Sequence, residues 1–297
     1  MIHKTAIIDS KAKISEKSDN ERNILLESAR MLLANLSYSL RNVKSDSKVI
    51  LVTSSVKGEG KTIISSTVSS ILSEDTNKKT LLIGADLRNP QIHKLIGTDK
   101  NVLGISDYIY NPKIKIEDIL IRHNNLDILL SGSIPPNASQ LLESQTFKNL
   151  IIEFRKKYEY IVIDTAPCLL VSDAFSIAPL ADVTVYVTRS NYTDKAICDF
   201  INETFRDKKF NDLNLVLNSV GTSAAYGYQY GYQYGYRYGY KYGYNYGYGY
   251  GYGYGYYDED KELKWYQRFF KRKSDESLIN VNILGPDFFD YTIKTRN

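Results

Sequence analysis

The chain has few of the residues that build disulfide frameworks and metal sites. Its 297 residues include only two cysteines and three histidines. Cys168 and Cys198 have no spacing typical of metal ligands or of paired cysteines, so we expect reduced thiols in or near the core. His3, His93 and His123 are scattered among polar residues without ligand-like neighbours, and we expect them at the surface. The sequence therefore gives no sign of a cysteine or histidine metal site.

Long apolar runs and a large excess of charge of one sign are also missing. No run approaches the ~18–20 residues needed to cross a bilayer. The first five residues, Met-Ile-His-Lys-Thr, lack the apolar core of a signal peptide. The formal net charge is only +4, so the charge does not indicate a surface that binds nucleic acid. We therefore expect a cytoplasmic protein without a nucleic-acid partner, whose contact with membranes is peripheral.

Between about residues 48 and 222, short apolar runs rich in β-branched residues alternate with segments of helical length. Strands separated by such segments predict crossover connections, and hence an α/β fold with a mainly parallel sheet and helices on both faces. Ligands of such folds bind at the carboxyl ends of the strands. The predicted strands are Val49–Thr53, Thr80–Ile83, Leu126–Leu130, Tyr160–Asp164, Val183–Thr188 and Leu213–Val220.

The composition divides the chain into four segments. Residues 1–47 form an N-terminal extension, and its first 20 residues are polar and expected to be loose. Residues 48–222 form the α/β domain, 223–257 a tyrosine- and glycine-rich tail, and 258–297 a C-terminal extension. An amphipathic helix is predicted from residue 20 or 21 to about residue 42, because apolar residues recur at helical spacing: Leu25, Leu26, Ala29, Leu32, Leu33, Leu36 and Leu40.

The tail has a strict alternating pattern. Every second residue from Tyr226 to Tyr256 is tyrosine, and Tyr257 brings the number to 17. Alternation would place the rings on one side of a strand, but glycine at most intervening positions makes order costly in entropy. We therefore predict a disordered tail with adhesive rings rather than a stable strand. Beyond it, the basic and aromatic segment 261–273 is predicted either as a short interfacial helix or as a solvated irregular segment.

A glycine-rich loop follows the first predicted strand and precedes a segment that can continue as a helix. Residues 55–62 read Ser-Val-Lys-Gly-Glu-Gly-Lys-Thr. At a helix start the backbone N–H groups of such a loop point at an anion, Lys61 adds a charge for β- and γ-phosphates, and the Thr62 hydroxyl can hold Mg²⁺. The motif predicts a P-loop for a nucleotide, with contacts from Ser55, Gly58, Glu59, Gly60, Lys61, Thr62 and Ile63.

Three further strand ends carry polar residues. The second predicted strand runs into Asp86 and Arg88. The strand 160–164 ends in Asp164, the usual position of a carboxylate that holds a Mg²⁺-bound water. Asn218 ends the last strand with an amide that is expected to read the edge of adenine. Their order and spacing predict an ATP·Mg²⁺ site whose metal is organised by Thr62, Asp86 and Asp164.

With these motifs the chain resembles the bacterial tyrosine kinases (BY-kinases) that accompany capsule and exopolysaccharide assembly. The resemblance covers about residues 24–222. Residues 27–36 resemble the family's N-terminal helix. Residues 132–142, Gly-Ser-Ile-Pro-Pro-Asn-Ala-Ser-Gln-Leu-Leu, resemble its Gly-x-x-Pro-Pro-Asn-Pro-Ser-Glu-Leu-Leu segment. The resemblance implies a P-loop ATPase fold without similarity to eukaryotic protein kinases.

The resemblance also implies an ATP-dependent tyrosine autokinase that regulates polysaccharide synthesis and export. Lys61 would stabilise charge on the transferring phosphoryl group, Asp86 would act as base or second metal contact, and Arg88 would orient Asp86 or the phosphates. The implied partners are an activating membrane protein of the chain-length-determinant type, a cognate tyrosine phosphatase and further copies of the chain in a ring. The expected phosphoacceptors include Tyr226, Tyr228, Tyr230, Tyr232, Tyr254, Tyr256 and Tyr257.

The chain departs from the family pattern at three places. Gly84 replaces the first aspartate of the family's Asp-x-Asp-x-Arg loop. Losing this carboxylate would cost ~10²–10⁴ in rate if it acts as base, or would weaken Mg²⁺ binding if it contacts the metal. A catalytically weak nucleotide-binding scaffold is therefore the alternative function. Leu33 replaces an arginine of the N-terminal helix, which would weaken ring assembly. Lys57 replaces a common proline, and Val56 occupies the position of the signature lysine of septum-placement and plasmid-partition ATPases, which argues against those relatives.

Overall fold

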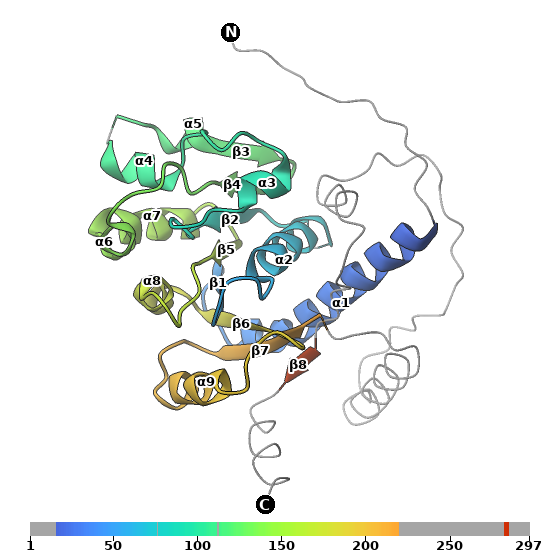
Figure 1. Cartoon of the computed structure of the whole chain (residues 1–297). Helices are drawn as coiled ribbons and strands as arrows, with labels where there is room; N and C mark the ends of the chain where they lie inside the picture. The colour runs from blue at the N-terminus through green and yellow to red at the C-terminus, as the bar shows by residue number, and fades with distance from the viewer. Residues whose placement is uncertain (1–15, 76, 112, 220–281, 285–297) are drawn as a thin grey trace, which may run out of the picture.

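An eight-stranded sheet forms the centre of the molecule (Figure 1). The structure, a computed structural model, describes residues 16–75, 77–111, 113–219 and 282–284. The strand order is β3-β4-β2-β5-β1-β6-β7-β8, and only the edge pairs β3·β4 and β7·β8 are antiparallel. The predicted mainly parallel sheet is confirmed. The strands are β1 (Lys48–Ser54), β2 (Thr80–Gly84), β3 (Leu120–His123), β4 (Leu126–Leu129), β5 (Tyr160–Asp164), β6 (Val183–Arg189), β7 (Leu213–Asn218) and β8 (Asn282–Leu284).

Helices cover both faces of the sheet, as predicted. Helices α1, α2 and α3 contribute side chains to the hydrophobic cluster on one face, and α4 to α9 contribute to the cluster on the other. The helices are α1 (Glu16–Arg41), α2 (Lys61–Asp75), α3 (Ile92–Ile96), α4 (Ile105–Tyr110), α5 (Ile116–Ile119), α6 (Ala138–Glu143), α7 (Gln145–Arg155), α8 (Asp173–Ile177) and α9 (Ile197–Arg206), with a short 3-10 turn η1 (Ala178–Leu180).

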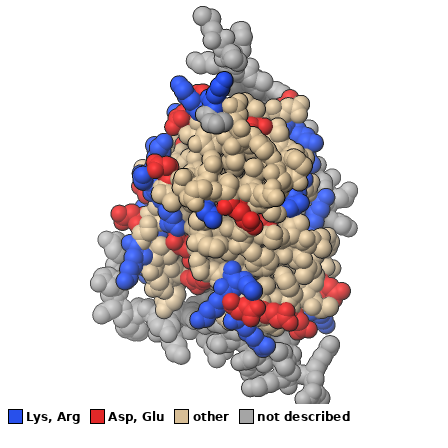
Figure 2. Space-filling view, turned by 90° about the vertical axis from the view of Figure 1, so that its left-hand side faces the viewer, with Lys and Arg blue, Asp and Glu red and all other residues tan. Residues whose placement is uncertain are grey.

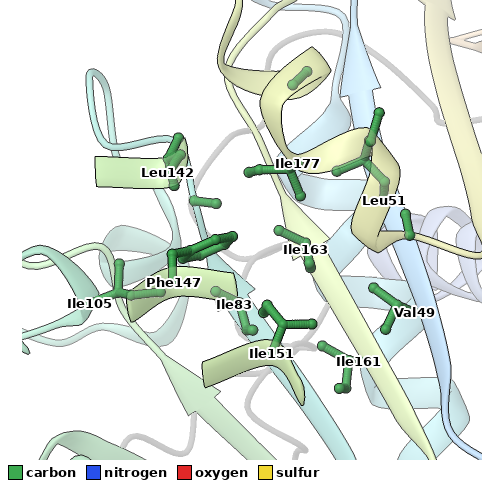
Figure 3. Packing of buried hydrophobic residues seen from close by; sticks show 14 of the residues in the cluster. Val49, Leu51, Ile83, Ile105, Leu142, Phe147, Ile151, Ile161, Ile163 and Ile177 are labelled. Carbon is green, nitrogen blue, oxygen red and sulfur yellow. The ribbon is translucent and has the colours of Figure 1, made fainter. Parts of the chain in front are cut away.

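The inner strands are buried on both faces because their side chains alternate between the two clusters. From β1, Val49 and Leu51 point into one cluster, and Ile50 and Val52 point into the other. Figure 3 shows the first cluster, in which Phe147 of α7 lies with aliphatic side chains of the central strands. Each such buried side chain contributes roughly 1.5–3 kcal/mol. The packing holds the carboxyl ends of β1, β2 and β5 side by side at one edge of the sheet.

The predicted amphipathic helix is confirmed as α1, but it begins at Glu16 rather than at residue 20 or 21. The expectation of a loose segment is therefore wrong from residue 16 onward, because the polar residues 16–20 continue the helix as its first turn. Its apolar side chains Ala29, Leu32, Leu36 and Leu40 are buried. They face α2 and the sheet, so the 3.6-residue spacing marks the packed side of the helix.

The sequence predictions missed two edge strands and placed the end of the last predicted strand two residues too late, whereas the other predicted strand ends lie within one residue of the observed ones. β3 is four residues long and partly exposed, and it turns into β4 through Asn124, whose φ is 51°. β8 is three residues long and lies in the C-terminal extension, for which no strand was predicted. The last predicted strand ends at Asn218 instead of Val220, because Ser219 adopts a φ of 56° that leaves the extended region. Short edge strands carry too few alternating residues to be recognised.

Two expectations about single side chains are wrong. His93 is buried, with 8% of its surface exposed, because α3 packs its first turn against the sheet. Burial also lowers the pKa of His93. Cys168 is buried as expected, but Cys198 is exposed on α9. His123 lies exposed at the end of β3, as predicted.

Several predicted features lie outside the described residues: His3, the tyrosine tail and the basic aromatic segment. Within the part that is described, no helix has the length and apolar character that a membrane span requires. On the face that Figure 2 shows, basic and acidic side chains are intermixed around a broad uncharged area. This distribution agrees with the small net charge of the sequence.

Candidate nucleotide and phosphoryl-transfer site

The P-loop connects β1 to α2 at the carboxyl edge of the sheet. Gly58 and Gly60 have φ values of 91° and 100°, a backbone region that favours glycine. A Cβ atom at Gly60 would also collide with the side-chain amide of Asn218. The backbone N–H groups of Ile63 and Ile64 donate to the Gly60 carbonyl and start α2. The loop has the shape that the motif predicts, with free helix-start N–H groups available to an anion.

Glu59 and Asn218 brace the P-loop from inside the protein. Glu59 is fully buried, and its carboxylate accepts hydrogen bonds from the Val56 N–H at 2.7 Å and from the Thr193 hydroxyl. Burial raises the pKa of Glu59, and these hydrogen bonds oppose the shift. The Asn218 amide donates to the Glu59 carbonyl at 2.8 Å, and its oxygen accepts from the Ser219 N–H. The Asn218 side chain therefore braces the loop, and its contact with adenine stays a prediction.

The other predicted contact residues Ser55, Thr62 and Ile63 differ in how deeply they are buried. The hydroxyl of Ser55 is buried and shares a hydrogen bond of 2.8 Å with the Tyr186 hydroxyl beneath the loop. Ile63 exposes 38% of its surface on the first turn of α2. Thr62 is nearly buried at the start of the same helix. The Ser55 side chain thus supports the loop, so Ser55 can contact a ligand only through its backbone.

A set of residues that the sequence analysis missed fastens the loop to the end of β6. Tyr186 contacts both Ser55 and Cys168, and burial raises the pKa of Tyr186. Arg189 donates to the Gly58 carbonyl at 3.1 Å, and the Tyr192 hydroxyl donates to the Lys57 carbonyl at 2.8 Å. These side chains lie more than 130 positions from the loop in sequence, and no motif marks them.

Lys61 and Asp86 form a buried ion pair beside the loop. The Lys61 ammonium lies 3.2 Å from Oδ2 of Asp86, and both side chains are less than 10% exposed. The other carboxylate oxygen of Asp86 accepts a hydrogen bond from the Asn89 N–H at 2.9 Å, which fixes the loop after β2. The structure thus brings together the two charged residues that the sequence predicted for phosphate and base.

Asp164 lies at the end of β5, in register with Gly84 of β2. It is 1% exposed, and burial raises its pKa to about 7. The Lys61 charge and contacts with Thr62 and Ser65 lower that pKa, while the charge of Asp86 raises it. A carboxyl group with this pKa is about half ionised near neutral pH, and a cation beside it would stabilise its ionised form.

One oxygen of Asp164, Oδ1, is buried without a hydrogen-bond partner. A buried unpaired carboxylate oxygen is costly, and a bound cation or its water would satisfy it. Mg²⁺ is usually held by one or two carboxylates together with substrate phosphates rather than by a cage of protein ligands. In keeping with this, the described ranges hold no cluster of three or more potential metal ligands of the His, Cys, Asp and Glu types. Thr62, Asp86 and Asp164 therefore fit a nucleotide-carried Mg²⁺.

Arg88 is held by hydrogen bonds to Asp173 and Ser139. Its guanidinium pairs with Asp173 at 2.9 Å and 3.1 Å and donates to the Ser139 hydroxyl at 2.9 Å. The Ser139 hydroxyl in turn donates to Asp173, whose side chain is fully buried. Arg88 thereby ties the loop after β2 to the starts of α6 and α8. The structure thus gives Arg88 a bracing contact, and its expected action on Asp86 or on phosphates stays a prediction.

The position of the missing family carboxylate, Gly84, is closely surrounded. A Cβ atom there would lie 2.9 Å from Oγ of Ser131 and 3.2 Å from Cδ1 of Ile92. The Ser131 hydroxyl donates to the Gly84 carbonyl at 2.7 Å. The neighbouring side chains have thus taken the space that a carboxylate at this position would need.

In the N-terminal helix, Glu27 and Arg30 form an exposed pair at 2.7 Å within one helical turn. Leu33, the apolar replacement of a family arginine, is partly buried against the α1 and α2 side of the core. An aliphatic side chain suits this position because it packs on the sheet-facing cluster. Glu27 and Arg30 remain on the outer surface of α1.

Comparisons with known proteins identify related chains. Residues 47–215 match the family described as AAA domain. The tyrosine-protein kinase YwqD of Bacillus subtilis is 32% identical over 206 residues, which cover 68% of this chain and 85% of YwqD. The tyrosine-protein kinase wzc of Salmonella typhimurium is 31% identical over 215 residues, 70% of this chain but only 29% of that longer protein.

A solved structure supports the same assignment. The crystal structure of the VpsO kinase domain is 32% identical in sequence and superposes with a TM-score of 0.59. The alignment covers 68% of this chain and 98% of the VpsO domain. The chain spans less than a third of long relatives such as wzc. On these grounds the chain belongs to the bacterial tyrosine-protein kinase family.

Proposed function

We propose that this chain transfers the γ-phosphoryl group of ATP to tyrosines of its own C-terminal segment, residues 226–257. The observation that carries the proposal is the meeting of Lys61, Asp86 and Asp164 beside the P-loop, with one carboxylate oxygen left unpaired. This is the arrangement that in-line phosphoryl transfer needs: a phosphate cradle, a cation and two carboxylates. The 17 tyrosines of the tail supply acceptors in the same chain.

The buried ion pair suggests how the residues change roles when ATP enters. Lys61 is attracted to the β- and γ-phosphates and leaves Asp86, which then lacks its countercharge. Asp86 becomes available to accept the proton of a tyrosine hydroxyl, whose ordinary pKa is about 10. Thr62 and Asp164 would hold Mg²⁺, which supplies positive charge to the phosphate oxygens. Arg88 keeps the loop that carries Asp86 in place through Asp173.

The proposal is tested by incubating the full chain with labelled ATP and Mg²⁺, followed by mass spectrometry of the tail. We expect phosphate on tail tyrosines of the wild type. Lys61→Ala should lose incorporation, because the site then lacks the side-chain charge that stabilises the transferring group. Lys44→Ala, which changes an exposed lysine of the linker before β1, should incorporate at the wild-type level. A wild type that binds ATP but leaves every tail tyrosine unmodified would refute the proposal.

The surroundings of Gly84 favour a second candidate function, a nucleotide-binding scaffold with weak catalysis. Ser131 and Ile92 fill the space beside Gly84, so no other carboxylate replaces the missing one there. Such a scaffold would bind ATP·Mg²⁺ with ordinary affinity and change its contacts without transferring phosphate. The assay above separates the two functions, because the scaffold would show nucleotide binding that depends on Lys61 and no incorporation into the tail.

In the cell, we propose that the chain works in capsule or exopolysaccharide synthesis and export, the setting that its family resemblance implies. The partners would be an activating membrane protein of the chain-length-determinant type, a tyrosine phosphatase and further copies of the chain. Each phosphate adds about −1.5 to −2 charges, so a multiply phosphorylated tail should repel neighbouring tails. We expect phosphatase-treated protein to sediment as a larger assembly than the phosphorylated protein. Equal sizes would contradict this regulation by charge.

A further inference from the structure

Tyr192 is an exposed tyrosine that contacts the nucleotide cradle. It lies in the connection between β6 and α9, and 51% of its surface is exposed. Its hydroxyl donates to the Lys57 carbonyl of the P-loop at 2.8 Å. Tyr38 and Tyr110 are also exposed, at 75% and 54%, but they belong to helices α1 and α4 and not to a segment bonded to this loop. Tyr192 thus combines access from solvent with a direct bond to the ATP site.

Arg189 completes a clamp on the loop together with Tyr192. Its guanidinium donates to the Gly58 carbonyl at 3.1 Å and lies 5.1 Å from the centre of the Tyr192 ring. Two consecutive P-loop carbonyls therefore accept hydrogen bonds from one short segment after β6. The phenol is packed closely against the loop, since a Cβ atom built on Gly58 would be 2.7 Å from the Tyr192 hydroxyl oxygen.

We propose that Tyr192 is itself a phosphorylation site of the kinase, modified by a second copy of the chain, and that its phosphorylation weakens nucleotide binding. The inference rests on the proposed kinase function. In the reaction, the bond between the γ-phosphorus of ATP and its bridging oxygen breaks and ADP leaves. A bond forms between the Tyr192 phenolic oxygen and that phosphorus. The phenolic proton passes to a carboxylate of the second copy, with Asp86 as the candidate, and from there to solvent.

In the present arrangement, the Tyr192 hydroxyl packs against the P-loop and leaves no room for a phosphate on its oxygen. A phosphate ester oxygen has no proton to donate, so the bond to the Lys57 carbonyl is lost. The group carries about −1.5 to −2 charges and would be repelled by that carbonyl oxygen. The nearby guanidinium of Arg189 would be drawn to the phosphate and away from the Gly58 carbonyl. Loss of both donors to the loop should weaken nucleotide binding by about tenfold.

The experiment compares three forms of the full chain: wild type, Tyr192→Phe and Tyr38→Phe. Each is incubated with ATP and Mg²⁺, cleared of nucleotide, and titrated with fluorescent ADP and Mg²⁺ before and after incubation. Phosphopeptide mass spectrometry reports Tyr192 and the tail separately. Tyr38→Phe is the matched control, because it removes an exposed tyrosine outside the site and leaves the tail intact. Tyr192→Phe itself loses the hydrogen bond to the Lys57 carbonyl, so each form is compared only with its own affinity before incubation, and the change on incubation isolates phosphorylation at position 192.

We expect phosphate on Tyr192 and an affinity loss of about tenfold on incubation for the wild type and Tyr38→Phe, but none for Tyr192→Phe. Phosphatase treatment should restore the affinity of the first two. A phosphorylated tail with unmodified Tyr192 would overturn this inference and leave the proposed kinase function standing. An equal change of affinity in all three forms would also overturn it. Absence of phosphate from the whole chain would instead refute the proposed function, and this inference with it.

Discussion

Asp164 should make magnesium-nucleotide binding depend on pH near neutrality. Burial raises its pKa to about 7, well above its ordinary value of 3.8. A carboxyl with that pKa is about 10% ionised at pH 6 and about 90% ionised at pH 8. Because Mg²⁺ binds the ionised form, the affinity for ADP·Mg²⁺ should rise about ninefold from pH 6 to pH 8. Fluorescence titration of the full chain at constant ionic strength measures this change.

The same buried group should affect the stability of the nucleotide-free protein. The pKa of Asp164 is higher in the folded chain than in the unfolded chain, so folding favours its neutral form. The stabilisation is fully present below about pH 4 and is lost as the pH rises through about 7. A shift from 3.8 to about 7 corresponds to a loss of up to about 4 kcal/mol in the free energy of unfolding. Urea unfolding at pH 4.5 and pH 8 measures it as the difference between wild type and Asp164→Asn.

Asp164→Asn serves as the control for both measurements because it cannot ionise and keeps a similar shape. Its stability should lack the loss between pH 4 and pH 7, and its nucleotide affinity should be low and nearly independent of pH. Other titrating groups remain the same in the two proteins, so their effects cancel in the comparison. If wild type and Asp164→Asn had parallel pH profiles, Asp164 would not carry a raised pKa and the reasoning about its buried oxygen would fail.

Three further substitutions test individual contacts of the site. Gly84→Asp should lower the free energy of unfolding by about 1–3 kcal/mol because its Cβ would approach Oγ of Ser131 to 2.9 Å, and Ser131→Ala in the same chain should recover part of the loss in urea unfolding. Arg88→Lys should lower stability by about 1–3 kcal/mol in thermal unfolding, because the buried Asp173 loses donors. Asn218→Ala should weaken ADP binding about two- to tenfold by titration, because the Glu59 carbonyl loses its 2.8 Å bond.

Matched controls distinguish these effects from general damage. Arg206→Lys on the exposed last turn of α9 should leave stability unchanged, and Asn101→Ala on the surface should leave nucleotide affinity unchanged. A Gly84→Asp chain as stable as the wild type would show that the pocket beside Gly84 opens easily. Full stability of Arg88→Lys would remove the bracing role from Arg88, and unchanged affinity of Asn218→Ala would separate Asn218 from the P-loop.

The sequence by itself determined the parts of this protein that depend on local pattern. Short β-branched runs separated by helical segments predicted the parallel sheet, since both faces of such strands are buried. The glycines of the P-loop and the carboxylates Asp86 and Asp164 at strand ends were recognisable because backbone conformation and strand termini fix these positions. The spacing of Leu32, Leu36 and Leu40 located α1 because a packed helix buries residues at a period near four.

Tertiary structure alone decided which distant residues meet at the site. The supports of the P-loop, Tyr186, Arg189 and Tyr192, come from the end of β6 because that strand pairs with β1, and strand order follows from the packing of the whole sheet. Packing also brought Arg88 to Asp173, 85 positions away in the sequence. The pKa of Asp164 depends on burial, which no local pattern measures. Residue type and spacing thus identified the reacting groups, whereas the three-dimensional packing set their contacts, their charge state and their supports.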